Sequence, residues 1–310
     1  MMASTSATEA VPSRPGFRST MLGARLREAG WGYGFVLAPI GVFGLFFIYP
    51  FIYAIYISFY HWGILGKQGS AHGTFNYSNV LHDPIFHTAL RNIAEYTFAV
   101  VPLELALGLS LALLINQKIR GRNFFRSSFY FPSIASSVAI TTIALYIFNA
   151  QGLFNQIIGS NRAWFADAST VGWSIVGLNT WTTSGTVMIF YLAALQSIPD
   201  DVYEAAAVDA TSAWRTFWRI TFPLLKPAHF FCIVVFGIGA LKLFDQAFIV
   251  ANGASGAPNY ATMVPIIYIY NEAFGNSDFG VAAAAGVIYF VIIFALTIVM
   301  RLTVGRQEPA

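Results

Sequence analysis

Long apolar runs separated by short polar segments organise this chain of 310 residues. A helix that crosses the roughly 30 Å hydrocarbon layer of a membrane needs about 20 apolar residues, because every backbone polar group has to be paired within the segment. Six stretches are long enough, so the sequence predicts six transmembrane helices. They run approximately over Trp31–Tyr60, Asn92–Ile115, Ser128–Phe148, Gly172–Leu195, Ala228–Val250 and Gly280–Met300.

The first stretch is long and contains Pro39 and Pro50, which indicates one tilted or kinked helix rather than two. A membrane β-barrel would show alternating segments of about 10 residues, whereas these runs are continuous. The composition agrees, with 56% hydrophobic and only 10% charged residues. We therefore predict an all-α integral membrane protein.

Basic residues set the orientation, because Lys and Arg near membrane ends stay on the cytoplasmic side. They concentrate in the N-terminal tail, in the connections after the second and fourth stretches, and at the C-terminus, so both termini are predicted to be cytoplasmic. Residues 1–30 are rich in Ser, Thr, Ala and Arg, and are predicted to form a disordered cytoplasmic tail before the first transmembrane helix over 31–60. The net charge of +3 follows from these signals, and no nucleic-acid surface is expected.

The most distinctive polar segment connects the fourth and fifth stretches. Pro199 and the acids after it are typical of a helix start, and the alanines that follow favour a helix of little bulk. Thr211 or Ser212 can cap a second short helix that carries aromatic residues at helical spacing. The segment is either an ordinary interfacial helix with its aromatics at the lipid headgroups or a docking element for a partner.

A family resemblance favours docking. Glu204-Ala205-Ala206, Asp209 and the trailing Phe217, Ile220 and Pro223 resemble the signature loop of permease subunits of bacterial ABC importers. In that family the loop forms the coupling helix that seats in a groove of the cytoplasmic ATPase. The usual form has Gly and then Ala after the Asp, where this chain has Ala210 and Thr211.

Other segments resemble the carbohydrate-importing branch of this family, in particular the first permease of maltose-type transporters. They are Tyr49-Pro50, Ser58-Phe59, Gly152-Leu153-Phe154-Asn155, Phe244-Asp245 and the glycine-containing loop Asn252–Pro258. The resemblance implies a type I ABC importer permease fold with a core over 88–301 and a coupling loop over 198–226. It also implies that ATPase coupling depends on Glu204, Ala205, Ala206, Asp209 and Ala210.

The chain itself has no phosphate-binding loop, because its only Gly66-Lys67 is followed by Gln68. We therefore expect no cofactor on this chain, with ATP and Mg held by a partner ATPase. The external histidines are too scattered for a metal site. No catalytic motif such as His-Glu-x-x-His or Gly-x-Ser-x-Gly occurs, which argues against a membrane-embedded enzyme.

Ionisable side chains inside membrane helices are costly and therefore mark candidate functional positions. Lys242 and Asp245 lie three residues apart on one face of the predicted fifth helix, where they either pair with each other or line a pathway. Glu104 either makes an interhelical hydrogen bond or contacts a solute.

The fourth stretch carries a run of hydroxyl and amide side chains from Asn179 to Thr186. Such groups can hold helices together, but a sugar also needs many hydrogen-bond partners and an aromatic face. We predict that Trp181, Thr183 and Thr186 border a translocation cavity.

The sequence thus predicts a permease subunit that imports a sugar, a di- or oligosaccharide or related polyol, across the bacterial inner membrane. The resemblance implies a second permease, two ATPase subunits and an extracytoplasmic solute-binding protein as partners, besides the membrane lipid. The alternative is an ion-coupled secondary transporter that uses the charges of Lys242, Asp245 and Glu104, although neither paired repeats nor broken helices are evident in the sequence.

Overall fold

The computed structural model describes residues 17–117, 120–209 and 211–304 and contains two compact units, Met1–Ala54 and Ile55–Ala310. The described residues of the first unit belong to one helix, made of α1 (Phe17–Phe43), a π-helical turn (Gly44–Ile48) and α2 (Tyr49–Ile57), whose last three residues belong to the second unit. Within the turn, the Tyr49 N–H donates to the Gly44 carbonyl. This widened turn directly precedes Pro50, whose ring disturbs the α-helical register. One helix therefore runs through both prolines, as predicted.

The prediction of a disordered tail over 1–30 is wrong for residues 17–30, which are helical; residues 1–16 lie outside the described part. Ala, Leu, Arg and Glu between positions 24 and 29 are strong helix formers, and this local preference does not require an apolar face. The candidate membrane span in this helix is Gly30–Ile57, so the predicted end at Tyr60 is three residues too late.

The second unit opens with a small antiparallel hairpin that an all-α prediction did not contain. Its strands are β1 (Tyr60–Gly63) and β2 (Gly66–Ala71), and Gly66 has a φ of 91°, which glycine adopts without strain. The buried amide of Asn76 donates to the carbonyls of Ser58 (2.8 Å) and Tyr60 (2.9 Å) and so anchors the hairpin to the next helix.

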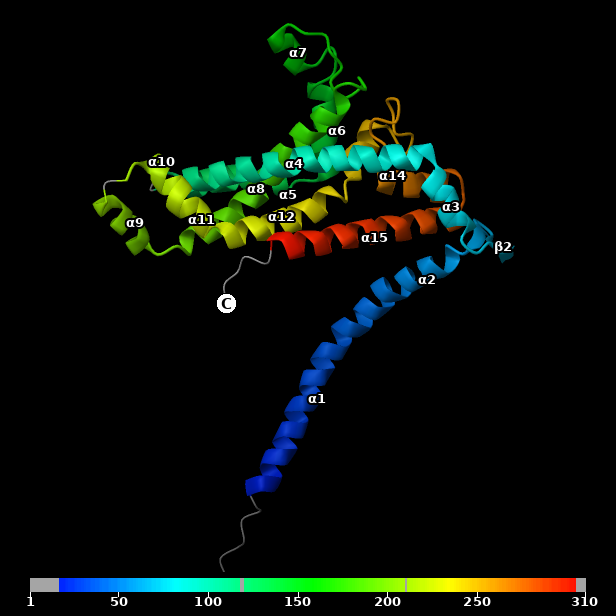
Figure 1. The fold of residues 1–310 in the computed structure, drawn as a ribbon, viewed down its shortest axis with the longest axis horizontal. Helices are drawn as coiled ribbons and strands as arrows, with labels where there is room; N and C mark the ends of the chain where they lie inside the picture. Colours follow the sequence, from blue (N-terminus) through cyan, green and yellow to red (C-terminus); the bar gives the residue numbers. More distant parts are fainter. Residues whose placement is uncertain (1–16, 118–119, 210, 305–310) are drawn as a thin grey trace, which may run out of the picture. The chain divides into compact units, whose positions relative to one another are not determined.

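The remaining elements of the second unit are helical, and Figure 1 shows how they are arranged. Helix α8 packs along α4, and α12 contacts α4, α8 and α15. Helices α9 to α11 lie at one end of this group, α3 and α14 lie at the other end, and α6 and α7 project from it. The elements are α3 (Phe75–His82), α4 (Pro84–Asn116), α5 (Arg122–Ile134), α6 (Ser137–Ile147), α7 (Leu153–Ile158), α8 (Val171–Gln196), α9 (Asp200–Val208), α10 (Ala213–Thr216), a π turn (Phe217–Thr221), α11 (Phe222–Leu224), α12 (Lys226–Ala240), α13 (Asp245–Val250), α14 (Pro265–Tyr270), a π turn (Asn271–Gly275) and α15 (Phe279–Val304).

The third predicted span is not one helix. Helices α5 and α6 meet at an angle of 94°, because Ala135 is extended, with a ψ of 155°. The residues on either side of it, from Ser133 to Ser137, include three serines, which are weaker helix formers than alanine or leucine.

The fifth predicted span is also interrupted, between Ala240 and Asp245. Leu241 and Leu243 lie in this interruption, and both are buried. Two residues that are two positions apart point to different sides of an α-helix, so a continuous helix would not bury both of them on one face. Burial in the core thus accounts for the break.

Four helices in the described residues are long and apolar enough to cross a membrane, or five if the bent α5–α6 pair forms one span. They are Gly30–Ile57, Pro84–Asn116, Lys226–Val250 and Phe279–Leu302. Helix α8 has 26 residues, but its polar run from Asn179 to Thr186 keeps it out of this set. Composition and length alone therefore support fewer spans than the six predicted.

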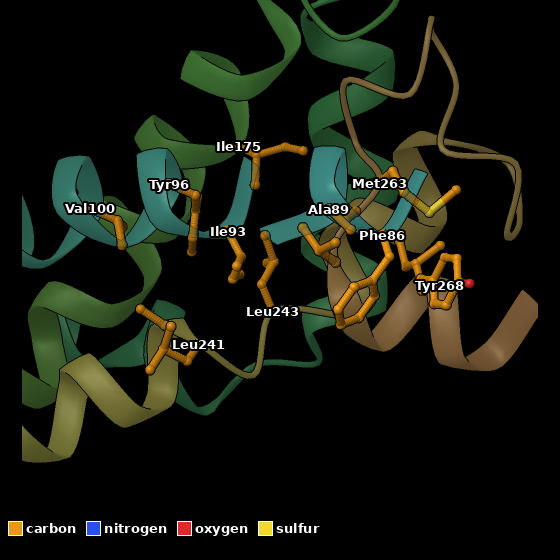
Figure 2. Close-up of a cluster of buried hydrophobic side chains, with 14 of the residues drawn as sticks. Phe86, Ala89, Ile93, Tyr96, Val100, Ile175, Leu241, Leu243, Met263 and Tyr268 are labelled. Atoms are coloured by element: carbon orange, nitrogen blue, oxygen red, sulfur yellow. The ribbon is translucent and has the colours of Figure 1, made fainter. Parts of the chain in front are cut away.

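Two clusters of buried side chains hold the second unit together. The first joins α4 to the start of α8, the α12–α13 break, α14 and α15, and Figure 2 shows Tyr96, Ile175 and Leu243 within it. The second joins the C-terminal halves of α4 and α8 to α12 and includes the fully buried Val187 and Cys232. The cavity described next lies beside these clusters.

Candidate functional site

A partly open cavity of about 220 Å³ lies at the elbow between α5 and α6. Helix α8 forms its longest wall, and single residues of α12 and α13 complete it. The polar run of α8 therefore faces an open space, where lipid would have offered its hydroxyls no partners. The lining residues are Pro132, Ser133, Ala135, Ser137, Ile140, Thr141, Leu178, Asn179, Thr182, Thr183, Thr186, Phe236 and Gln246.

Hydrogen bonds position the wall of α8. The Asn179 amide donates to the Tyr96 hydroxyl of α4, and the Thr183 hydroxyl donates to Asn179 Oδ1 at 2.8 Å. On the neighbouring side, the Ser133 hydroxyl of α5 donates to the Thr182 carbonyl. These bonds tie α8 to α4 and α5 and fix the orientation of its polar face.

Thr183 and Thr186, two of the three predicted cavity residues on α8, are among the lining residues, whereas Trp181 is not. Trp181 is 53% exposed on another face of the helix. At about 100° per residue, Thr183 and Thr186 fall on the side that also carries Asn179, while Trp181 points roughly the opposite way to Thr183. The prediction grouped Trp181 with Thr183 and Thr186 because they are close in sequence, but on a helix Trp181 faces another side.

The expected pairing of Lys242 with Asp245 is wrong. Lys242 lies in the break between α12 and α13, so the two residues do not share a helical face. In the described residues, the ion pairs join Arg91 to Glu95 and Arg162 to Asp167. Lys242 and Asp245 are both exposed, and neither borders the cavity.

Glu104 is buried in α4, with 3% of its surface exposed, and does not border the cavity. Among the described residues, no side chain or backbone group makes a hydrogen bond with the Glu104 carboxyl. The interhelical hydrogen bond, one of the two roles considered for Glu104, is therefore not formed there. Glu104 is thus a buried carboxyl away from the candidate solute contacts.

Sequence reasoning missed the contributions of Ser137 and Gln246 to the cavity. Both lie beside helix breaks, Ser137 at the start of α6 and Gln246 at the start of α13. The serines around Ala135 and the Phe244-Asp245 pair were visible in the sequence. The direction in which each chain segment leaves its break is set by long-range packing, and no local pattern indicates it.

The predicted coupling segment is a compact pair of short helices. Asp200 and Asp201 lie in the first turn of α9, and Ser212 caps α10 through the Arg215 N–H at 3.4 Å. Glu204, Ala205 and Asp209 are exposed, while Ala206 is buried. The exposed face therefore combines acidic groups with residues of little bulk.

The elbow between α9 and α10 is held by Thr211. Its backbone N–H and its hydroxyl donate to the Ala206 carbonyl at 3.2 and 2.8 Å, and its hydroxyl lies 2.9 Å from that of Thr216. Ala210, which stands where the resembled family has glycine, lies outside the described residues. Thr211 thus satisfies a carbonyl at the C-terminal end of α9 that would otherwise lack a helical partner.

The segment after α6 is fixed by Asn155, another residue of the resemblance. Its buried amide donates to the carbonyls of Asn149 (2.8 Å) and Arg162 (2.7 Å), and its oxygen accepts from the Trp164 indole (2.9 Å). Nearby, hydrogen bonds from the Ser169 backbone and hydroxyl lower the pKa of the exposed Asp167.

A comparison with protein families identifies the family to which the chain belongs. Residues 104–308 match the family described as "Binding-protein-dependent transport system inner membrane component". The chain belongs to this family, and it is therefore a membrane permease subunit of an ABC importer. Membership decides against the ion-coupled secondary transporter, even though the structure contains broken helices that the sequence did not reveal.

Curated relatives agree over most of the chain. The lactose transport system permease protein LacF of Rhizobium radiobacter is 32% identical over 274 residues, which cover 86% of this chain and 91% of the relative. The trehalose/maltose transport system permease protein MalF of Thermococcus litoralis is 31% identical over 287 residues, covering 91% and 96%. These relatives put the chain with the carbohydrate-type permeases.

A solved structure shares the fold. The crystal structure of a bacterial ABC transporter involved in the import of the acidic polysaccharide alginate contains a chain with a TM-score of 0.81 and 21% identity. The match covers 93% of this chain and all of that chain. The fold is therefore that of a type I ABC importer permease.

Proposed function

We propose that this permease subunit carries a neutral sugar, a di- or oligosaccharide or related polyol, into the cytoplasm in an ATP-driven importer. The observation that carries the proposal is the hydroxyl- and amide-lined cavity in a chain whose relatives are named as lactose and trehalose/maltose permeases. Sugars need several hydrogen-bond partners, and this wall supplies them. Thr183 and Thr186 belong to the pathway in this proposal.

Membership of the family supports a proposal for the partners. A second permease completes the channel, two ATPase subunits hold ATP and Mg, and an extracytoplasmic protein delivers the solute. We place the α9–α11 end in the cytoplasm of a bacterial cell, with both chain termini on that side. Arg122, Arg126, Arg215, Arg219 and Lys226 belong to segments at this end, and basic residues favour the cytoplasmic side.

Coupling to the ATPases depends on the loop 198–226, through Glu204, Ala205, Ala206, Asp209 and Ala210. Glu204, Ala205 and Asp209 are exposed and available for contact, whereas Ala206 is buried. The exposed α9 is the support for this assignment, because a helix rich in alanine lets a partner surface approach closely. ATP binding would move this loop and switch the two permeases between their two conformational states. This switch requires that the ATPases bind the loop more tightly in one state than in the other.

Uptake by the complete transporter in proteoliposomes tests this function. Lactose, maltose and trehalose are offered as labelled probes, with ATP inside and the binding protein outside. We expect uptake of at least one probe that requires ATP and persists with an uncoupler. Uptake that requires no ATP and stops with the uncoupler would overturn the proposal.

A further inference from the structure

The short helix formed by α10, the π turn after it and α11 is packed on one side and exposed on the other. On the packed side Thr221 is buried, and Phe217 packs against the second cluster of buried side chains. On the other side Trp214, Trp218 and Phe222 are exposed to 73%, 47% and 36%. This α10–α11 helix is therefore amphipathic, with an aromatic outer face.

The exposed rings form one row along the helix, with cations beside it. The ring centroids of Trp214 and Trp218 lie 5.6 Å apart, and those of Trp218 and Phe222 lie 5.1 Å apart. Arg215 and Arg219 are exposed, and each follows a tryptophan, so at roughly 100° per residue they flank the row rather than oppose it. A helix that lies in a membrane interface has this composition, because its rings enter the lipid while its cations stay with the headgroups.

The two helices of the coupling segment carry opposite charge. Residues 200–209 contain four acidic and no basic side chains, whereas residues 213–224 contain two arginines and no acidic side chain. Neither arginine takes part in an ion pair within the described part of the chain. An anionic lipid surface attracts a basic helix and repels an acidic one. The outer face of the α10–α11 helix and the exposed face of α9 therefore suit different partners.

The aromatic row also adjoins a membrane span. The candidate span Lys226–Val250 begins two residues after α11 ends at Leu224. Tryptophan rings close to the end of a span lie at the level of the lipid headgroups. The exposed Lys226 adds a third cation at this level. The lipid leaflet at this end of the span is thus within reach of the outer face.

We propose that the outer face of the α10–α11 helix binds anionic phospholipids. Trp214, Trp218 and Phe222 lie at the boundary between headgroups and acyl chains, and Arg215 and Arg219 bind the lipid phosphates and anionic headgroups. This contact holds the base of the coupling segment at the membrane surface and leaves α9 free for the ATPase. It does not depend on the solute, so a failure of sugar import would leave it standing.

Quenching by brominated lipids tests this contact in the complete transporter, reconstituted in bilayers with the cysteines of the other subunits replaced. The chain has one cysteine, so C232A gives a background for single cysteines. W214C carries a bimane label on the outer face, and V208C carries one on α9, where Val208 is 86% exposed, as the matched control. The bilayers contain brominated phosphatidylglycerol or brominated phosphatidylcholine in the same lipid mixture.

We expect brominated lipid to quench the label at W214C at least about threefold more strongly than at V208C. Brominated phosphatidylglycerol should quench W214C at least about twofold more than brominated phosphatidylcholine does, because the arginines attract the anionic headgroup. The double variant R215Q/R219Q should bring this lipid ratio to about one. R91Q, which removes an exposed cation from α4, should leave it unchanged.

The competing partner for this face is the ATPase. A label at W214C that is shielded from aqueous iodide and is not quenched by brominated lipid would assign the face to a protein partner and overturn the proposal. Equal quenching by the two brominated lipids would overturn the preference for anionic lipid. W218C gives a second reading on the same face, so poor assembly of one variant leaves the other decisive.

Discussion

Single glycines decide how closely the helices of the second unit approach each other. A Cβ at Gly185 of α8 would overlap the Phe129 carbonyl oxygen of α5, and one at Gly108 of α4 would overlap the Val187 side chain of α8. Small residues allow helices in membranes to pack backbone to backbone. The two glycines therefore set the spacing of the helices that support the cavity.

Gly185→Leu should destabilise the permease by about 1–3 kcal/mol, because backbone atoms cannot move aside as a flexible side chain does. The matched control is Gly177→Leu on the same helix, where a Cβ would meet nothing within 4 Å. Thermal unfolding of the purified complex measures the effect. Equal midpoints for both variants would contradict the close approach of α5 and α8.

Asn155 is a single residue that holds the segment after α6 through its hydrogen bonds. Asn155→Ala removes the acceptor for Trp164 and the donor for three carbonyls, and buried groups that lose partners cost about 1–3 kcal/mol each. We expect faster hydrogen exchange across residues 149–170. Gln156→Ala, which removes an exposed hydrogen bond on the same helix, is the control and should leave exchange near the wild-type rate.

At the scale of elements, helix breaks complete the site whose longest wall is the helix α8. The α5–α6 elbow of 94° and the interruption before α13 bring Ser137 and Gln246 to the wall formed by α8. The elbow between α9 and α10 similarly turns the exposed face of α9 outward, with Thr211 holding the turn.

Thr211→Val keeps the shape of the side chain but removes two hydroxyl interactions at this elbow. We expect a loss of about 1 kcal/mol in local stability and faster proteolysis between α9 and α10. Thr88→Val, which removes one exposed hydroxyl bond on α4, is the control. If proteolysis between α9 and α10 is as slow in Thr211→Val as in the wild type, the Thr211 hydroxyl is not needed to hold the elbow.

At the scale of the whole molecule, the predicted coupling segment lies at one end of the second unit, while the hairpin, α3 and α14 lie at the other. The cavity lies between these ends, at the elbow of α5 and α6. This arrangement suits a permease that receives solute at one end and a mechanical signal at the other.

Glu204→Lys should reduce ATP-driven uptake at least about tenfold, because a reversed charge on the exposed face of α9 disfavours docking of a complementary partner. The control is Glu95→Lys, which breaks only an exposed ion pair with Arg91, an interaction of small energy. Uptake and copurification of the ATPase are measured together. Wild-type uptake in Glu204→Lys would remove the docking role of this residue.

The sequence by itself determined the features that depend on local composition and period. These are the apolar stretches, the acidic alanine-rich helix Asp200–Val208 and the family resemblance, since each depends on short local runs of residues. Only the tertiary structure decided where helices break, that Leu241 and Leu243 are both buried, and which face of α8 borders the cavity. Trp181 was misplaced because it lies two residues from Thr183 and therefore points to the opposite side of α8. The Lys242–Asp245 pair was misplaced because packing of distant segments around Leu241 and Leu243 interrupts the helix between them.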